Sequence, residues 1–343
     1  MVYYNHQTNR PMKIRAFITH KKCEKYADCQ DRFFISRNKK SIAVSDGMSQ
    51  SFFPDIWAEL LSKHYAENTL FTEKDIDMLA EQWRGRVKEY IDKHRGEPDF
   101  SWRTESSFDE GRTAGATICG VTFTDSGHWR GCVLGDSCII KIKKNGTPQI
   151  YTSQQKPFDC YPDYYDSKGF KFGKGSIASF GGELEKDAVL LLVSDPFAEF
   201  IENHKENFTD YLNQILSLVN HNDFCKLVER WRGEGMHNDD STLCVIEPGD
   251  SYKFKVKHED DINKLVLNEQ EVTKVESGPQ QENCETEQML EQCLNVIENY
   301  IKNIVEIIKK IPSNSGKKKA VKKCYKKLKS VCDKLLKKRI NKL

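Results

Sequence analysis

The sequence predicts an α+β protein in which an antiparallel β-sandwich is flanked by α-helices. Short apolar runs of the kind that form strands recur through the first 250 residues, and Gly, Asp or Asn bound most of them. Helical patterns come in groups instead of alternating with single strands. Because a parallel sheet needs a crossover, usually a helix, between successive strands, this grouping favours antiparallel pairing.

The apolar runs expected to form strands are 14–18, 32–36, 42–45, 116–123, 131–134, 138–142, 188–193 and 242–246. Helical patterns cover 54–68, 73–94, 196–203 and 209–232. The second helix follows a Thr72-x-x-Asp75 capping box, which is typical of a helix start. Residues 153–187 contain five glycines and few apolar runs, so we expect a loop or flap there.

The pattern changes after residue 247, which predicts three parts: a main domain at 1–247, a polar linker at 248–285 and a helical hairpin at 286–343. The linker shows little periodicity beyond an edge-strand pattern at 252–256. The hairpin consists of two amphipathic helices, and thirteen Lys or Arg but one acidic residue lie between 312 and 343. The other residues carry 40 basic and 50 acidic side chains.

The partner of this basic hairpin is open. Its helices could pack on each other or on the main domain, with the lysines in solvent. An acidic protein partner suits the charge asymmetry. A membrane surface or a nucleic acid fits less well, because the helices lack Trp and Phe anchors and show no base-reading motif.

Composition points to a globular protein of the cytoplasm. The 343 residues are 38% hydrophobic, enough to fill a sizeable core, and the formal net charge is +2. None of the twelve cysteines forms a C-x-x-C pair, and several lie in apolar runs, so we expect reduced thiols. No apolar run reaches the roughly 18 residues of a membrane span.

Acidic residues stand at the ends of four apolar runs. They are Gln30-Asp31, Ser45-Asp46-Gly47, Ser194-Asp195 and Asp239-Asp240. A single Asp in such a turn is far more often a turn residue or a helix cap than a ligand. Four together suit hard divalent cations, which take oxygen ligands and can activate water when two of them share a site.

Six stretches carry a family resemblance. They are Cys-Gln-Asp-Arg-Phe at 29–33, Ala-Val-Ser-Asp-Gly at 43–47, Ala-Gly-Ala-Thr at 114–117, Leu-Gly-Asp-Ser at 134–137, Leu-Leu-Leu-Val-Ser-Asp at 190–195 and Asn-Asp-Asp-Ser-Thr-Leu at 238–243. In this order they resemble the type 2C family of metal-dependent protein phosphatases (PPM), as in a bacterial-like member with an added C-terminal helical extension. The resemblance spans roughly 11–247. It implies a sandwich of two antiparallel β-sheets flanked by α-helices, with metals in a cleft between the sheets.

The resemblance also implies roles for individual residues. Asp46 would bridge two Mn²⁺ or Mg²⁺ ions, the Gly47 carbonyl would complete one of them, and Asp195 and Asp239 would hold the other. Asp46 and Asp239 would act in catalysis through metal-bound water. Asp31 would lie behind these ligands.

A third, weaker metal is held in some relatives by a carboxylate that matches Asp136, together with Asp195. Three residues differ from the family pattern near the site. Met48 stands where many members have a His that can protonate the leaving group, and Tyr26 stands at the position of the phosphate-binding Arg. Replacements near the latter are His20, Lys21 and Lys22. Pro196 replaces a Gly, which a helix start tolerates.

The implied activity is hydrolysis of phosphoserine or phosphothreonine in proteins by a hydroxide bridging the two metals, opposing a Ser/Thr kinase. No C-x5-R loop or Walker A motif supports another phosphate chemistry. The alternative is a pseudophosphatase, a regulatory phosphoprotein-binding module without turnover. Met48 and the missing Arg favour this alternative, and the intact set Asp46, Gly47, Asp195 and Asp239 favours the enzyme.

Overall fold

The computed structural model describes residues 10–97, 100–124, 128–144, 146–154 and 162–273. The chain divides into two units, Met1–Glu271 and Val272–Leu343. Nearly all described residues belong to the first unit. The hairpin expected at 286–343 lies outside the described residues.

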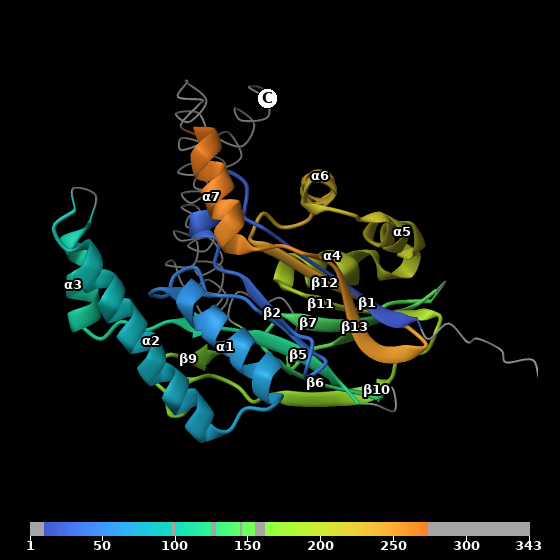
Figure 1. The fold of residues 1–343 in the computed structure, drawn as a ribbon, viewed down its shortest axis with the longest axis horizontal. Coiled ribbons are helices and arrows are strands. Elements are labelled where there is room, and N and C mark those ends of the chain that lie inside the picture. The colour runs from blue at the N-terminus through green and yellow to red at the C-terminus, as the bar shows by residue number, and fades with distance from the viewer. Residues whose placement is uncertain (1–9, 98–99, 125–127, 145, 155–161, 274–343) are drawn as a thin grey trace, which may run out of the picture. The chain divides into compact units, whose positions relative to one another are not determined.

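Two β-sheets form the centre of the first unit (Figure 1). The six-stranded sheet has the order β13 (Ser251–Glu259), β1 (Pro11–Thr19), β12 (Ser241–Glu247), β11 (Ala188–Val193), β7 (Cys138–Lys143) and β8 (Gln149–Tyr151). The five-stranded sheet has the order β10 (Ala178–Glu183), β6 (His128–Leu134), β5 (Ile118–Phe123), β3 (Ser41–Ser45) and β2 (Arg32–Ser36). A small ladder joins β4 (Gly115–Ala116) to β9 (Tyr165–Asp166).

Helices cover the outer face of each sheet (Figure 1). On the five-stranded sheet, α1 (Pro54–Asn68) contacts the strands, α2 (Glu73–His94) packs on α1, and α3 (Trp102–Asp109) packs on α2. The six-stranded sheet is covered by α4 (Asp195–His204), α5 (Thr209–Ser217) and α6 (His221–Gly233), and α7 (Ile262–Thr273) follows β13. Short 3₁₀ helices are η1 (Tyr26–Asp28), η2 (Phe170–Phe172) and η3 (Lys205–Asn207). No helix in the described ranges has the length and apolar character needed to span a membrane.

Three apolar layers hold the sandwich together. Ile14 and Leu192 from the six-stranded sheet share one buried cluster with Val44 and Val121 from the five-stranded sheet. Two further clusters lie between the outer faces of the sheets and their helices. Because side chains alternate along a strand, both faces of each sheet are buried. The predicted fold class is therefore confirmed, with one pair of strands as an exception: β13 runs parallel to β1.

The helix expected at 209–232 is in fact two helices, α5 and α6. The break lies at the cap of α6, where the Asn220 side chain accepts a hydrogen bond of 3.0 Å from the Asp223 N–H. Such a cap satisfies a backbone donor that the first turn of a helix leaves free. The apolar periodicity continues across the break, which is why the sequence indicated one helix.

Part of the predicted flap at 153–187 is the edge strand β10, which pairs with β6. Gly181 and Gly182 in this strand indicated a loop, but a Cβ on Gly181 would lie 3.0 Å from the Trp129 carbonyl oxygen. Gly181 thus permits the close approach of β10 to the backbone of β6 at Trp129, whose side chain is 1% exposed.

The expected linker at 248–285 contains β13 and α7 in its described part. Along β13, Tyr252, Phe254 and Val256 pack against the cluster between the sheets, and lysines alternate with them. This period of two is that of a strand with one buried face. The boundary between the two compact units falls after residue 271.

A glycine in β5 provides a test of the packing of α1 on the sheet. A Cβ at Gly120 would overlap the ring of Tyr65, which is 2% exposed, whereas a Cβ at Gly85 on α2 would meet nothing within 4 Å. We expect Gly120→Ala to lower the free energy of unfolding by about 1–3 kcal/mol through overpacking. The control Gly85→Ala should raise it by up to about 1 kcal/mol, because Ala favours a helix. Urea unfolding measures both, and equal stability of the two variants would contradict this packing.

Candidate functional site

Carboxylates at strand ends of the five-stranded sheet lie at one of its edges. β2 and β3 are antiparallel, and the start of β2 is paired with the end of β3. Asp31, directly before β2, and Asp46, directly after β3, therefore leave the sheet on the same side. A bridge between Gly47 and Ala116 then ties this turn to β4.

The six-stranded sheet brings a second group of carboxylates to one edge. The end of β11 is paired with the starts of β7 and β12. Asp136 lies just before β7, Asp195 just after β11, and Asp239 just before β12. The end of β1 is also paired with the start of β12, so Lys21 follows at the same edge.

The two groups face each other across the sandwich. Burial, followed by the nearby charges of Asp31 and Asp195, raises the pKa of Asp46 well above its usual range. Burial and the charges of Asp136 and Asp239 do the same for the pKa of Asp195, although a hydrogen bond between the Asp195 and Asp46 side chains partly opposes the rise. The carboxylates of both sheets thus form one cluster of like charge.

Asp31 is the most deeply buried member of this cluster. It is fully buried, and neither of its carboxyl oxygens has a hydrogen-bond partner of ordinary geometry in the described part of the chain. Burial, followed by the charge of Asp240, raises the pKa of Asp31 to about 7, and the neighbouring hydroxyls of Thr242 and Ser194 only partly offset this. A buried carboxyl without partners is costly unless a cation or a proton compensates it.

Asp240 has a different, structural function. Its carboxylate accepts hydrogen bonds from the Lys21 N–H at 2.9 Å and from the Gln30 N–H at 2.7 Å. These two bonds close the segment 20–30 onto β12. They thereby fix the backbone at Lys21 and at Gln30, directly before Asp31. The sequence did not reveal this role of Asp240.

Of the three residues considered for phosphate binding, Lys21 lies at the carboxylate cluster. Its Nζ is 3.3 Å from Asp239 Oδ1 and 3.4 Å from Ser49 Oγ. His20 instead stacks edge-on against Tyr26 and faces Glu269 of α7. The Lys22 side chain is exposed to solvent.

Arg232 of α6 supports the same corner from behind. Its Nη2 donates to the backbone carbonyl of Asp239 at 2.7 Å and to that of His20 at 3.2 Å. The guanidinium thus joins the turn before β12 to the turn after β1. Its sequence position, at the end of a helical pattern, gave no signal of this role.

The turn after β3 is packed too tightly for a side chain at Gly47. A Cβ there would lie 2.8 Å from the Pro54 Cβ and 3.0 Å from the Gln30 carbonyl oxygen. The bridge to β4 uses the Asp46 carbonyl, which accepts from Thr117 N–H at 2.9 Å, and the N–H of Met48. The Gly47 carbonyl takes no part in these two bonds.

The chemistry of this cluster suits hard divalent cations. All of its ligand atoms are oxygens, and Asp31 adds buried oxygens that lack hydrogen-bond partners of ordinary geometry among the described residues. Within the described ranges, however, no three His, Cys, Asp or Glu side chains already stand at positions to hold one ion. Residue types and charge therefore fit such cations, and the side chains would have to adjust to hold them.

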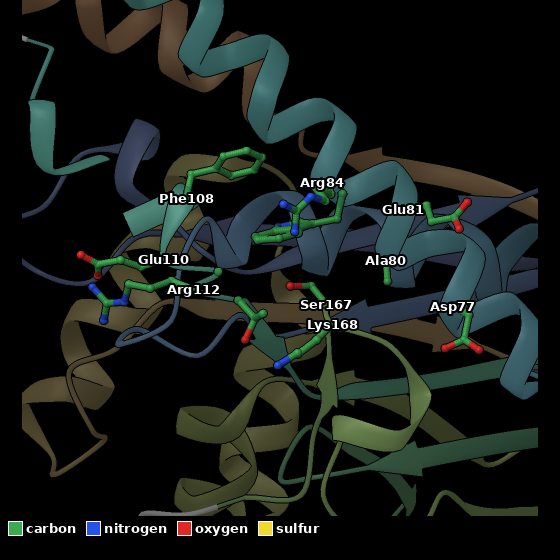
Figure 2. A pocket seen from close by; sticks show the side chains of 12 residues that line it. Asp77, Ala80, Glu81, Arg84, Phe108, Glu110, Arg112, Ser167 and Lys168 are labelled. Atoms are coloured by element: carbon green, nitrogen blue, oxygen red, sulfur yellow. The ribbon is translucent and has the colours of Figure 1, made fainter. Parts of the chain in front are cut away.

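A groove begins at Met48, in the turn that follows Asp46, although no carboxylate of the cluster lines it. Its inner part, of about 320 Å³, is lined by Met48, Gly115 and Tyr164, among others. Its outer part, of about 510 Å³, lies between α2 and the segments around Glu110 and Ser167 (Figure 2). Both parts share Arg112 and Thr113. No pattern in the sequence predicts this groove.

Basic and acidic side chains line the outer part of the groove in equal number. The basic residues are Arg84, Arg112 and Lys168, and the acidic residues are Asp77, Glu81 and Glu110 (Figure 2). Arg84 lies over the ring of Phe108, 5.1 Å from its centroid. The groove can therefore contact a polar, charged chain.

Comparisons with known proteins gave structural likenesses only. No family model matches the chain, and no curated protein matches its sequence. A serine/threonine phosphatase of S. agalactiae is 16% identical, with 69% of this chain and 99% of that chain covered, at a TM-score of 0.45. PppA, described as a regulatory component of the T6SS in Pseudomonas aeruginosa, is 12% identical with 69% and 97% covered at 0.47. The serine/threonine phosphatase Stp1 of Staphylococcus aureus is 13% identical with 68% and 94% covered at 0.46.

Cation binding can be tested without any assay of activity. A ligand at 100 times its Kd adds about 2.7 kcal/mol to the free energy of unfolding. Since 1 kcal/mol shifts the unfolding temperature of a domain of this size by about 2–4 °C, Mn²⁺ at that concentration should raise the unfolding temperature by about 5–10 °C. Asp46→Asn should raise the unfolding temperature of the metal-free protein, since it removes one of several repelling charges, and should lose most of the response to Mn²⁺. Differential scanning calorimetry measures both effects.

The matched control for this experiment is Asp210→Asn on α5, where the side chain is exposed. This variant should respond to Mn²⁺ as the wild type does. An equal response in Asp46→Asn would contradict the assignment of a cation site to the cluster.

Proposed function

We propose that the protein is a metal-dependent phosphatase that hydrolyses phosphoserine and phosphothreonine in proteins. The observation that supports it most is the convergence of strand-end carboxylates from both sheets into one partly buried cluster of like charge. Six sequence stretches that resemble the type 2C family contain these same residues. The substrate would then be a phosphoprotein produced by an opposing Ser/Thr kinase.

Asp46, Asp195, Asp239 and the Gly47 carbonyl would hold two Mn²⁺ or Mg²⁺ ions, and Asp136 with Asp195 a third, weaker one. When bound, such cations supply an activated water as nucleophile and neutralise charge on the phosphate. The protein supplies rigidity, because each ligand stands at the end of a buried strand. No residue of the chain needs to form a covalent bond to phosphate in this reaction.

Lys21 would take the place of the phosphate-binding Arg of the family. Its ammonium group pairs with Asp239 at 3.3 Å. If Asp239 held a cation, the Lys21 ammonium would leave this carboxylate because of like-charge repulsion and remain at the edge of the site. There it can donate to a phosphate oxygen, in the manner of a point charge.

The groove beside Met48 and Arg112 would take the peptide on one side of the phosphorylated residue. It begins where Met48 and Gly115 line its inner part and continues outward past Arg112. Its mixed charge suits a polar peptide without demanding one charge sign. Met48 itself offers no acid for the leaving group, so protonation of the leaving oxygen would come from water.

The proposal predicts release of phosphate from a phosphothreonine peptide in the presence of Mn²⁺ or Mg²⁺. EDTA should stop the release, and Asp239→Asn should abolish it, because the variant loses a ligand charge while the fold is retained. Asp136→Ala should lower the rate only in part or raise the metal concentration needed. A malachite green assay of released phosphate measures all three.

Asp210→Asn serves again as the control and should retain full activity. A wild-type protein that binds Mn²⁺ but releases no phosphate from several phosphopeptides would support the pseudophosphatase and refute turnover. Near wild-type activity of Asp239→Asn at saturating Mn²⁺ would refute the assignment of the ligands.

Lys21 and Lys22 form a matched pair for testing phosphate binding. Lys21→Ala should lower kcat/KM by about 10- to 100-fold, since a hydrogen bond to a charged group contributes about 1.5–3 kcal/mol. Lys22→Ala removes an equal charge from the neighbouring residue, whose side chain is exposed to solvent. It should change kcat/KM less than twofold. Equal effects of the two substitutions on kcat/KM would mean that Lys21 acts only through the overall electrostatic potential of the surface and does not contact the phosphate.

A further inference from the structure

A second cluster of reactive side chains lies behind the segment 20–30, on the side of α6. Cys225 and His221 are four residues apart on this helix and thus share a face, with Sγ 3.3 Å from His221 Nε2. The other ring nitrogen of His221, Nδ1, lies 2.8 Å from Asp260 Oδ2. A thiol, an imidazole and a buried carboxylate therefore stand in line.

The carboxylate at the end of this line is firmly fixed. The Asp260 side chain is 2% exposed, and it accepts the Ile18 N–H at 3.0 Å and faces His258 Nε2 at 2.8 Å. These contacts join β1, β13 and the start of α7 to α6. A carboxylate held in this way orients the His221 ring and favours its charged form.

Charge and exposure set Cys225 apart from the other thiols. Although burial opposes it, hydrogen bonds with Asp260 and Cys225 raise the pKa of His221 to about 10. Burial would raise the pKa of Cys225, but the adjacent His221 lowers it below the usual value. The other free cysteines in the described ranges are fully or almost fully buried, and burial raises the pKa of each of them: Cys29, Cys119, Cys132, Cys138 and Cys244.

We propose that Cys225 is a modification site at which hydroperoxides oxidise the thiolate to a sulfenic acid, with His221 as the proton donor. The Cys225 side chain is partly exposed, which gives a small oxidant access. Tyr26 Oη and Thr19 Oγ1 each lie 3.7 Å from Sγ and cover part of the sulfur. This cover suits a small peroxide better than a polypeptide substrate.

The reaction is balanced by groups in this cluster and the oxidant. The thiolate sulfur attacks one oxygen of the hydroperoxide, an S–O bond forms and the O–O bond breaks. Sulfur loses two electrons and the peroxide gains them. The leaving hydroxide or alkoxide takes the proton from His221, so that water or an alcohol, a neutral His221 and the sulfenic acid of Cys225 result.

Oxidation at this position would reach the segment 20–30, which carries Lys21 and leads directly to Asp31. Of the two residues that contact the sulfur, Thr19 immediately precedes this segment and Tyr26 lies within it. Tyr26 Oη also lies 2.7 Å from His221 Nε2. The backbone N–H of Tyr26 donates a hydrogen bond of 2.9 Å to the carboxylate of Glu269 in α7. An added oxygen on sulfur and a neutral His221 would disturb these contacts and loosen residues 20–30.

The full-length protein is treated with hydrogen peroxide and dimedone, and each cysteine-containing peptide is quantified by mass spectrometry. The Cys225 peptide should be labelled at least about tenfold faster than the Cys244 peptide, because only a thiolate attacks peroxide. His221→Gln should slow labelling of Cys225 about tenfold or more. Labelling of Cys225 no faster than that of Cys244 would overturn the proposal.

A second measurement does not depend on a folded variant. In the wild type, the rate of Cys225 alkylation by iodoacetamide should rise less than tenfold per pH unit between pH 6 and 8, because the adjacent His221 lowers the pKa of this thiol. The titratable groups that face this thiol are His221 on its own helix and Tyr26 of η1, with Asp260 behind His221 and Arg232 at longer range. A rate that rises about tenfold per pH unit would show an ordinary thiol and refute the site.

Hydrogen exchange tests the structural consequence. Peroxide treatment should increase the exchange rate of the amides of residues 20–30 in the wild type. In Cys225→Ser the same treatment should leave this rate unchanged. Faster exchange in both proteins, or in neither, would refute the connection between the thiol and this segment. None of these readouts requires phosphatase activity, so their outcome is separate from that of the proposed function.

Discussion

The site depends on one constraint, which is that antiparallel pairing brings the end of one strand and the start of its neighbour to the same edge. In both sheets this places acidic residues at the same edge, and stacking of the sheets brings the two groups together. Their mutual repulsion and burial raise the pKa of Asp46 and Asp195. The apolar layers of the sandwich hold these charges together, and in our account divalent cations compensate them.

Many of the strands and helices could be predicted from the sequence, because buried strands consist of apolar runs. The bounds of β2, β11, α1 and α2 agree with the expected ranges. The edge strand β10 was missed, because Gly181 serves the close approach to the backbone of Trp129, which is distant in the sequence. The break between α5 and α6 was missed because the apolar pattern continues through the cap at Asn220.

At the site, local patterns indicated the acidic residues but not what holds them. Asp240 closes the segment 20–30 by accepting two backbone hydrogen bonds, and Arg232 joins two turns through their carbonyls. Three of these contacts connect residues more than 200 positions apart and leave no local signal; the fourth, from Arg232 to the Asp239 carbonyl, spans seven residues. The same segment packs against Cys225 on its other side, so one short piece of chain connects the carboxylate cluster with the reactive thiol.

The central claim is that the carboxylate cluster binds divalent cations. It is tested most directly by crystals of the protein grown with Mn²⁺, measured at an X-ray wavelength at which manganese gives an anomalous signal. The account predicts anomalous peaks in contact with the carboxylates of Asp46, Asp195 and Asp239. Well-diffracting crystals with saturating Mn²⁺ and no peak in contact with any of these side chains would contradict it.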